Sequence, residues 1–162
     1  MERKLDYEEI FKILNKDKVK YLVVGAYAVI YYTEPRYTKD IDIWVKPEIT
    51  NAKKTYNSLR KFGAPLNGVK ASDFTKRDMV YQIGVAPIRI DVLMNIKGIH
   101  FDLAWKHRKK VKYGKEVIGI LNLNDVVKSK MKAGRKQDIL DLEKLEKVKN
   151  RNKIKQARKL GN

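Results

Sequence analysis

Cysteine is absent from the 162-residue chain, and this absence excludes three kinds of chemistry. Disulfide bonds, thiolate zinc sites and cysteine nucleophiles all need a thiol group. Histidine is scarce as well, with two in the chain, so a metal ion would have to bind mainly through oxygen ligands. The P-loop pattern and the Rossmann glycine pattern are also missing, so kinase and dehydrogenase functions have no support.

Long hydrophobic runs are missing too. No stretch approaches the roughly 18 uninterrupted apolar residues that are needed to cross a bilayer. The segment MERKLDYEEIFKIL at the start of the chain is charged throughout and lacks the apolar centre of a secretory signal. These features predict a cytoplasmic protein with no membrane partner. The apolar fraction of 43% is ordinary for a globular protein of this length, which predicts one domain with one core.

Acidic residues are in short supply. The chain has 37 lysines and arginines against 19 aspartates and glutamates, which gives a net charge of +18. Two zones, residues 104–115 and 147–162, contain six and seven basic residues and no acidic one. Such surfaces attract phosphate polyanions such as nucleic acids. A lysine-rich surface that serves only solubility is the alternative.

The first half of the chain predicts alternating helices and strands. Apolar residues within 7–14 recur at i, i+3, i+4 and i+7, which predicts a helix. Residues 21–24 predict a short strand, followed by a tight turn at Gly25 and a helix that ends before Pro35. The segment DIDIWV at 40–45 predicts a second strand.

The second half continues in the same manner. A helix is predicted to end near Gly63, and MVYQIG and PIRIDVLM predict two strands joined by a short turn. Residues 100–110 predict a short helix, and 111–120 a small β excursion. Two helical segments hinged near Gly134 follow, and Asn124 is placed to cap the first of them.

The domain organisation follows from these elements. We expect a single α+β domain at 1–149, with a mixed central sheet flanked by helices. Its core would span about 20–96 and its C-terminal helical part about 99–149. Apolar periodicity is lost after Asn150, so residues 150–162 are expected to form a frayed or partly helical basic tail.

Three aspartates on predicted strands are the strongest candidates for chemistry. Because side chains alternate along a strand, Asp40 and Asp42 share one face with Trp44, and Asp91 takes the equivalent face of a later strand. Like charges about 4 Å apart cost on the order of 4 kcal/mol at an effective dielectric constant near 20. A divalent cation such as Mg²⁺ or Mn²⁺ removes this cost by binding the oxygens. Solvated aspartates on an edge strand are the alternative. Trp44 either stacks on a base or belongs to the core.

The surroundings of these aspartates resemble a known family. In VVGAYA, Gly25 and Ala26 follow a strand and open a helix, thirteen residues follow, and then come Asp40 and Asp42. This order, with a later lone aspartate, resembles the nucleotidyltransferase fold of the DNA polymerase beta superfamily. That superfamily usually has Gly or Ser where Ala26 stands, so a hydroxyl contact to phosphate would be lost, while backbone N–H donation would remain.

Two further blocks resemble the small stand-alone members of that superfamily, the group that includes nucleotidyltransferase toxins of abortive-infection and toxin–antitoxin systems. The segment PRYTKDIDIWV matches their first block through Arg36 and Thr38 as well as the aspartates. The segment KMKAGRKQDILDL matches a later helix. The matching positions in that helix are Lys130, Arg135, Asp138 and Asp141. The resemblance extends over residues 21–145.

The resemblance implies a minimal nucleotidyltransferase fold and a set of site residues. Asp40, Asp42 and Asp91 would bind Mg²⁺ or Mn²⁺ and act in catalysis. The residues implied to contact the nucleotide are Gly25, Ala26, Arg36, Thr38 and Lys130. Arg135, Asp138 and Asp141 are further candidates, for which a structural salt bridge is the alternative.

The implied activity is transfer of a nucleoside monophosphate from an NTP to an acceptor hydroxyl, with release of pyrophosphate. The toxin-like resemblance and the two basic zones favour RNA, such as a tRNA 3′ end, as the acceptor. The resemblance also implies an antitoxin protein as a partner. Transfer to a protein or to a small molecule such as an antibiotic is one alternative. A non-catalytic module that binds nucleotide or nucleic acid is another.

Overall fold

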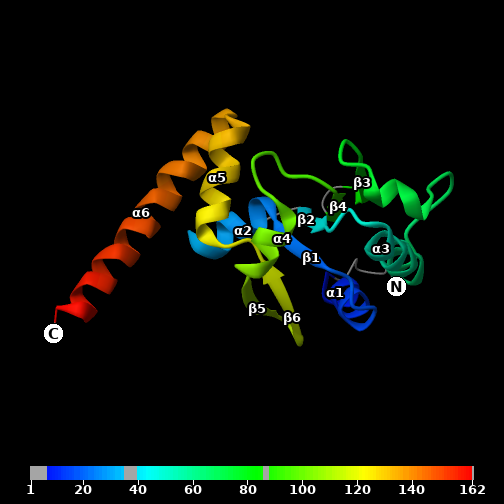
Figure 1. Ribbon diagram of the computed structural model, residues 1–162, viewed down its shortest axis with the longest axis horizontal. Coiled ribbons are helices and arrows are strands. Elements are labelled where there is room, and N and C mark those ends of the chain that lie inside the picture. The colour runs from blue at the N-terminus through cyan, green and yellow to red at the C-terminus, as the bar shows by residue number, and fades with distance from the viewer. Residues whose placement is uncertain (1–6, 35–39, 86–87, 162) are drawn as a thin grey trace.

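A mixed six-stranded sheet with helices on both faces forms the protein (Figure 1). The structure is a computed structural model that describes residues 7–34, 40–85 and 88–161. Its elements in chain order are α1 (Tyr7–Lys16), β1 (Tyr21–Val24), α2 (Gly25–Tyr32), β2 (Asp40–Val45), α3 (Ile49–Phe62), the 3-10 helix η1 (Ala71–Thr75), β3 (Val80–Val85), β4 (Ile88–Leu93), α4 (Phe101–Lys106), β5 (Lys109–Tyr113), β6 (Glu116–Ile120), α5 (Leu123–Ala133) and α6 (Lys136–Leu160).

The sheet has the strand order β3-β4-β2-β1-β6-β5. Strand β2 runs parallel to β4, and β1 runs parallel to β6. The other neighbouring strands are antiparallel. The expected α+β class with a mixed central sheet is therefore confirmed.

Both faces of the sheet are buried under helices. Helices α1 and α3 cover one face, where Ile41 and Ile43 belong to the core. Helices α2, α4, α5 and α6 cover the other face, where Trp44 belongs to a second core. Because strand residues alternate between faces, Asp40 and Asp42 lie on the same face as Trp44. The sheet therefore presents these aspartates to the layer that contains α2, α5 and α6.

The structure bears out one local prediction and corrects another. The expected small β excursion is the hairpin of β5 and β6, which extends the main sheet because β6 pairs with β1 at Ile120 and Val23. Burial of Ile120 explains this position. The cap of α5 is Asn122 rather than Asn124, since the Asn122 side chain accepts a hydrogen bond of 2.9 Å from the backbone N–H of Asp125. The helix begins two residues earlier than expected.

Helix α6 continues without a break from Lys136 to Leu160, so the segment after Asn150 is helical rather than frayed. Its C-terminal half extends away from the sheet (Figure 1), and residues 151–161 are all exposed. Lysine, arginine, glutamine and alanine are good helix formers, which lets this segment stay helical without an apolar face. Within the described residues, no helix has the length and apolar character that crossing a membrane requires.

Candidate active site

The strand register brings the predicted carboxylates together. On the parallel strands β2 and β4, Asp42 lies opposite Asp91, and Asp40 lies opposite Arg89. These four side chains share one face of the sheet, as the alternation in the sequence predicted. The structure therefore places Asp40, Asp42 and Asp91 in neighbouring positions, although about forty residues separate the two strands in the chain.

Arg89 lies among these carboxylates, and the sequence analysis assigned it no role. Its Nη2 atom lies 3.3 Å from Asp40 Oδ2 and 3.3 Å from Asp91 Oδ2. Its Nε atom forms an ion pair with Asp91 Oδ1 at 3.1 Å, but the geometry is not that of a hydrogen bond. Asp91 Oδ1 is buried and accepts no hydrogen bond from the described residues. The sequence did contain an indication of this role, because Arg89 lies two residues before Asp91 and therefore on the same face of the strand. Arg89 therefore neutralises part of the cluster's charge.

Burial and mutual repulsion raise the pKa values of two carboxyl groups in the cluster. Burial, followed by the charges of Asp91 and Asp40, raises the pKa of Asp42 to about 6, from an ordinary value of 3.8. Burial also raises the pKa of Asp91, although Arg89 works against this increase. Raised carboxylate pKa values are typical of a site that binds a cation, because a bound cation would favour the ionised form. The shifts show that burial and the neighbouring aspartates together outweigh the opposing effect of Arg89.

Gly25 is required where it stands for two separate reasons. Its φ angle is +67°, in the left-handed region that residues with a side chain avoid. A Cβ atom built on Gly25 would also collide with the carboxylate of Asp42. The absent side chain thus lets the start of α2 approach Asp42 closely.

Gly25→Ala should lower nucleotidyl transfer by about 10²-fold, because the added methyl group displaces the Asp42 carboxylate. The positive φ angle should cost about 1 to 2 kcal/mol of unfolding free energy as well. The matched control is Gly68→Ala, because Gly68 has a φ angle of +73° and no atom within 4 Å of the added Cβ. This control should lose similar stability in urea unfolding and keep full activity. Equal activity in the two variants would contradict the proposed contact.

The N-terminus of α2 offers backbone donors to this region. The N-cap is Val24, which has no polar side chain and forms no side-chain cap. The first backbone N–H groups of a helix have no partner within the helix, and such groups bind phosphate well. Gly25 and Ala26 are the first two residues of α2, and their contact with phosphate stays a prediction from the resemblance.

The later block forms a buried ionic cluster between α5 and α6. Lys130 Nζ lies 3.0 Å from Asp138 Oδ1 and 3.3 Å from Asp141 Oδ2, and all three residues are buried. Arg135 Nε donates to Asp138 Oδ2 at 2.8 Å. Burial alone would raise the pKa of Asp138, but hydrogen bonds from Arg135 and Lys130 lower it to about 2. The salt-bridge interpretation of Arg135 and Asp138 is therefore confirmed.

A cleft of about 190 Å³ is lined by residues from the glycine turn, from strand β2 and from the Lys130–Asp138 segment. Residues that line it include Gly25, Asp42, Lys97, Lys130, Arg135 and Asp138. Lys97 was missed by the sequence analysis because it lies in an irregular loop outside every matching block. Among the described residues, no acidic side chain forms an ion pair with Lys97, whereas Lys130 is bound to two aspartates. Lys97 is therefore the more available cation for a bound triphosphate.

Some predicted residues have a different status. Arg36 and Thr38 lie outside the described residues, so their roles stay predictions. Trp44 is buried, and its ring contacts Phe101 edge-on at 5.0 Å, which confirms that it belongs to the core.

The carboxylates fit a hard divalent cation. No three described His, Asp or Glu side chains converge closely enough to hold an ion by themselves. Mg²⁺ does not require such a cage, because it commonly binds one or two carboxylates and completes its shell with water and substrate phosphate. The buried Asp91 Oδ1, which accepts no hydrogen bond within the described part of the chain, and the raised pKa of Asp42 agree with this mode of binding.

Comparisons with known proteins agree on the class. The chain is similar in fold to the lincosamide antibiotic adenylyltransferase LnuA, with a TM-score of 0.55 and 16% identity over 88% of this chain and 98% of that one. It is also similar to a candidate nucleotidyltransferase, TM1012, from Thermotoga maritima, with a TM-score of 0.56 and 18% identity over 89% of this chain and 90% of that one. The fold is thus that of nucleotidyltransferases. No curated protein sequence matches the chain significantly.

The family follows from a sequence model. Residues 3–160 match the model of the nucleotidyl transferase family of unknown function DUF2204, and the chain belongs to that family. The protein is therefore a nucleotidyltransferase, as the sequence analysis expected. The match covers nearly the whole chain, including α6.

Proposed function

We propose that this protein transfers a nucleoside monophosphate from an NTP to a hydroxyl group of RNA and releases pyrophosphate. The observation that carries the choice of acceptor is the position of the two basic zones. Although about thirty residues separate them in the sequence, residues from both zones line one groove of about 800 Å³. Lys109 contributes from the first zone, and Lys149 and Lys153 contribute from α6.

Other features of this groove also suit a nucleic acid. Its lining contains amide side chains from Asn122, Asn152 and Gln156, which can hydrogen-bond bases and sugars. Beside it, Lys109 Nζ lies 5.3 Å from the ring of Tyr31, an exposed aromatic residue on which a base could stack. Cations with aromatic side chains are the usual combination in single-strand binding.

The groove and the cleft are connected by α5. The start of this helix lines the groove and its end lines the cleft. Eleven residues of α-helix span about 15 Å. A single strand bound along the groove could therefore present its terminal hydroxyl group to the cleft.

In the proposed site, the chain holds the triphosphate through the N–H groups of Gly25 and Ala26 and the ammonium group of Lys97. Asp40, Asp42 and Asp91 would hold Mg²⁺ or Mn²⁺, which when bound neutralises developing charge on the phosphoryl oxygens. Asp91 accepts the proton of the attacking hydroxyl at a carboxylate oxygen. The hydroxyl oxygen forms a bond to the α-phosphorus, the bond from that phosphorus to the bridging oxygen breaks, and pyrophosphate leaves.

The test is a label-transfer experiment with each NTP labelled at the α-phosphate. The protein is incubated with Mg²⁺ and, separately, with purified tRNA, total protein extract and a small-molecule extract. Label that comes to the RNA fraction and resists protease supports the proposal. Label in the protein or small-molecule fraction, with none in RNA, would refute the choice of acceptor and keep the enzyme class.

Replacing Lys149 and Lys153 with glutamine should weaken RNA binding and flatten its salt dependence. Each lost phosphate contact lowers the slope of log affinity against log salt by about 0.7 to 0.9, so the slope should fall by about 1.5. The matched control is the pair Lys53 and Lys54, which is exposed on α3 over the opposite face of the sheet. This control removes the same charge. Equal slopes for both variants would mean that net charge alone drives binding.

A small molecule is the second candidate acceptor. The fold resembles that of LnuA, whose structure contains lincomycin and which is an antibiotic adenylyltransferase. At 16% identity this likeness concerns the fold, so a small-molecule acceptor is tested as one arm of the label-transfer experiment. A toxin-like role with an antitoxin partner stays a prediction from the sequence resemblance, as does the cytoplasmic location.

A further inference from the structure

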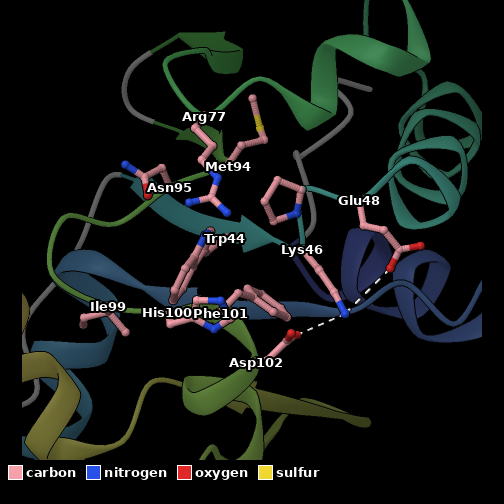
Figure 2. Close-up of a pocket in the computed structure, with 11 residues that line it drawn as sticks. Trp44, Lys46, Glu48, Arg77, Met94, Asn95, Ile99, His100, Phe101 and Asp102 are labelled. Atoms are coloured by element: carbon pink, nitrogen blue, oxygen red, sulfur yellow. Dashed lines mark ion pairs between the residues drawn. The ribbon is translucent and has the colours of Figure 1, made fainter.

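A second cavity, which shares no lining residue with the nucleotidyl-transfer cleft, lies at the carboxyl ends of the parallel strands β2 and β4 (Figure 2). Its volume is about 110 Å³. Trp44 and Phe101 give it an apolar wall, and both are buried. The proposed reaction uses none of its lining residues. Cavities beyond the carboxyl ends of parallel strands are a common position for ligand sites.

An unpartnered donor lies in the wall of this cavity. The Nε1 atom of Trp44 is buried and has no hydrogen-bond partner among the described residues, and Trp44 as a whole is 2% exposed. A buried N–H group without a partner costs about 1 to 3 kcal/mol. The indole N–H can only donate, so whatever satisfies it must carry an acceptor atom.

A cation lines the same cavity as this donor. Figure 2 shows the guanidinium group of Arg77 directed toward the Trp44 indole. No described acidic residue forms an ion pair with Arg77. The acidic residues of the cavity, Glu48 and Asp102, are instead bound to Lys46 at 3.7 and 3.0 Å. Arg77 is exposed and lines the same cavity as the unpartnered N–H group, so its guanidinium group is accessible to a bound anion.

We propose that this cavity binds a small organic oxyanion, with one oxygen accepting the Trp44 Nε1–H and the guanidinium of Arg77 pairing with its charge. The planar fork of a guanidinium suits carboxylate and phosphate oxygens. The apolar wall of Trp44 and Phe101 accommodates the organic part of the molecule. Asn95, which also lines the cavity, supplies an amide donor at its edge.

The indole N–H resonances give a direct test. The chain has two tryptophans, so ¹⁵N-labelled protein shows two indole signals, which Trp44→Phe and Trp105→Phe assign. Titration with propionate in one arm and with methyl phosphate in the other should move the Trp44 signal downfield, with saturation at concentrations on the order of 1 to 10 mM. If propionate has the lower dissociation constant, the site prefers carboxylates, and if methyl phosphate has the lower one, the site prefers phosphates. The Trp105 signal serves as the internal reference.

Two variants sharpen the test. Arg77→Gln should weaken binding by about tenfold or more, because hydrogen bonds to charged groups contribute about 1.5 to 3 kcal/mol. Arg60→Gln, which removes the same charge from an exposed position on α3, should bind like the parent protein. A Trp44 signal that stays fixed in both arms, or that moves equally in the parent and Arg77→Gln, would overturn the proposal. Asp42→Asn should keep this binding, which separates the site from the nucleotidyl-transfer cleft.

Discussion

Asp42→Asn should lower nucleotidyl transfer by about 10³-fold and leave the protein at least as stable as the parent. Asp42 lines the cleft, lies opposite Asp91 in the sheet and contacts the start of α2. Asparagine keeps the shape of the side chain but has no negative charge with which to hold Mg²⁺. Loss of several kcal/mol of transition-state stabilisation corresponds to a rate decrease of this size. Pyrophosphate release at saturating NTP is the measurement.

The stability of this variant should depend on pH in a defined direction. The pKa of Asp42 is raised from 3.8 to about 6, so the folded protein holds a proton that the unfolded chain has released. The contribution of Asp42 is therefore fully present below pH 3.8 and is lost as the pH rises through 6. An asparagine side chain does not titrate, and at pH 7.5 the unfolding free energy of Asp42→Asn should exceed that of the parent by about 1 to 2 kcal/mol. This figure allows for partial solvation of a half-buried group.

The matched control for Asp42→Asn is Asp17→Asn. Asp17 contacts Ser58 and Lys61 of α3, which covers the opposite face of the sheet. This variant should keep its transfer rate. Added Mg²⁺ should raise the unfolding midpoint of the parent at pH 7.5 and leave that of Asp42→Asn unchanged. If Asp42→Asn kept the parent's transfer rate, the assignment of the active site would be wrong.

The core of the site could be predicted from the sequence because it depends on local periodicity. Alternation along a strand placed Asp40 and Asp42 on one face, and a glycine between a strand and a helix marked the turn that opens α2. The predicted facing of Asp91 is confirmed by the β2–β4 register. These features need only a few neighbouring residues, so no long-range information was required.

Long-range packing determined what the sequence could not show. Arg89 became a partner of two carboxylates only through the parallel pairing of β2 with β4. The groove formed only because β6 joined the central sheet and α6 continued past Asn150, which brought Lys149 and Lys109 to one cavity. Lys97 lies in a loop with no periodic pattern. Contacts of this kind depend on the global arrangement of elements, which periodicity does not specify.

Lys130→Met should lower the free energy of unfolding by about 3 kcal/mol, because it removes a cation from two buried carboxylates. Asp138 and Asp141 are buried, and both would lose the Lys130 ammonium group while keeping their hydrogen bonds from Arg135 and Gln137. The lost contacts are the ones that join α5 to α6. Urea unfolding at neutral pH measures the change.

Lys128→Met is the matched control for this prediction, since Lys128 is exposed on the same helix and the substitution is chemically identical. Its unfolding free energy should stay within about 0.5 kcal/mol of the parent's. Asp141→Asn in the Lys130→Met background should restore about 1 to 2 kcal/mol, because it removes a buried charge that has lost its ion pair with Lys130. Equal losses in Lys130→Met and Lys128→Met would mean that the buried cluster does not hold the two helices together. Lys130 would then be free to contact the triphosphate, as the sequence resemblance first implied.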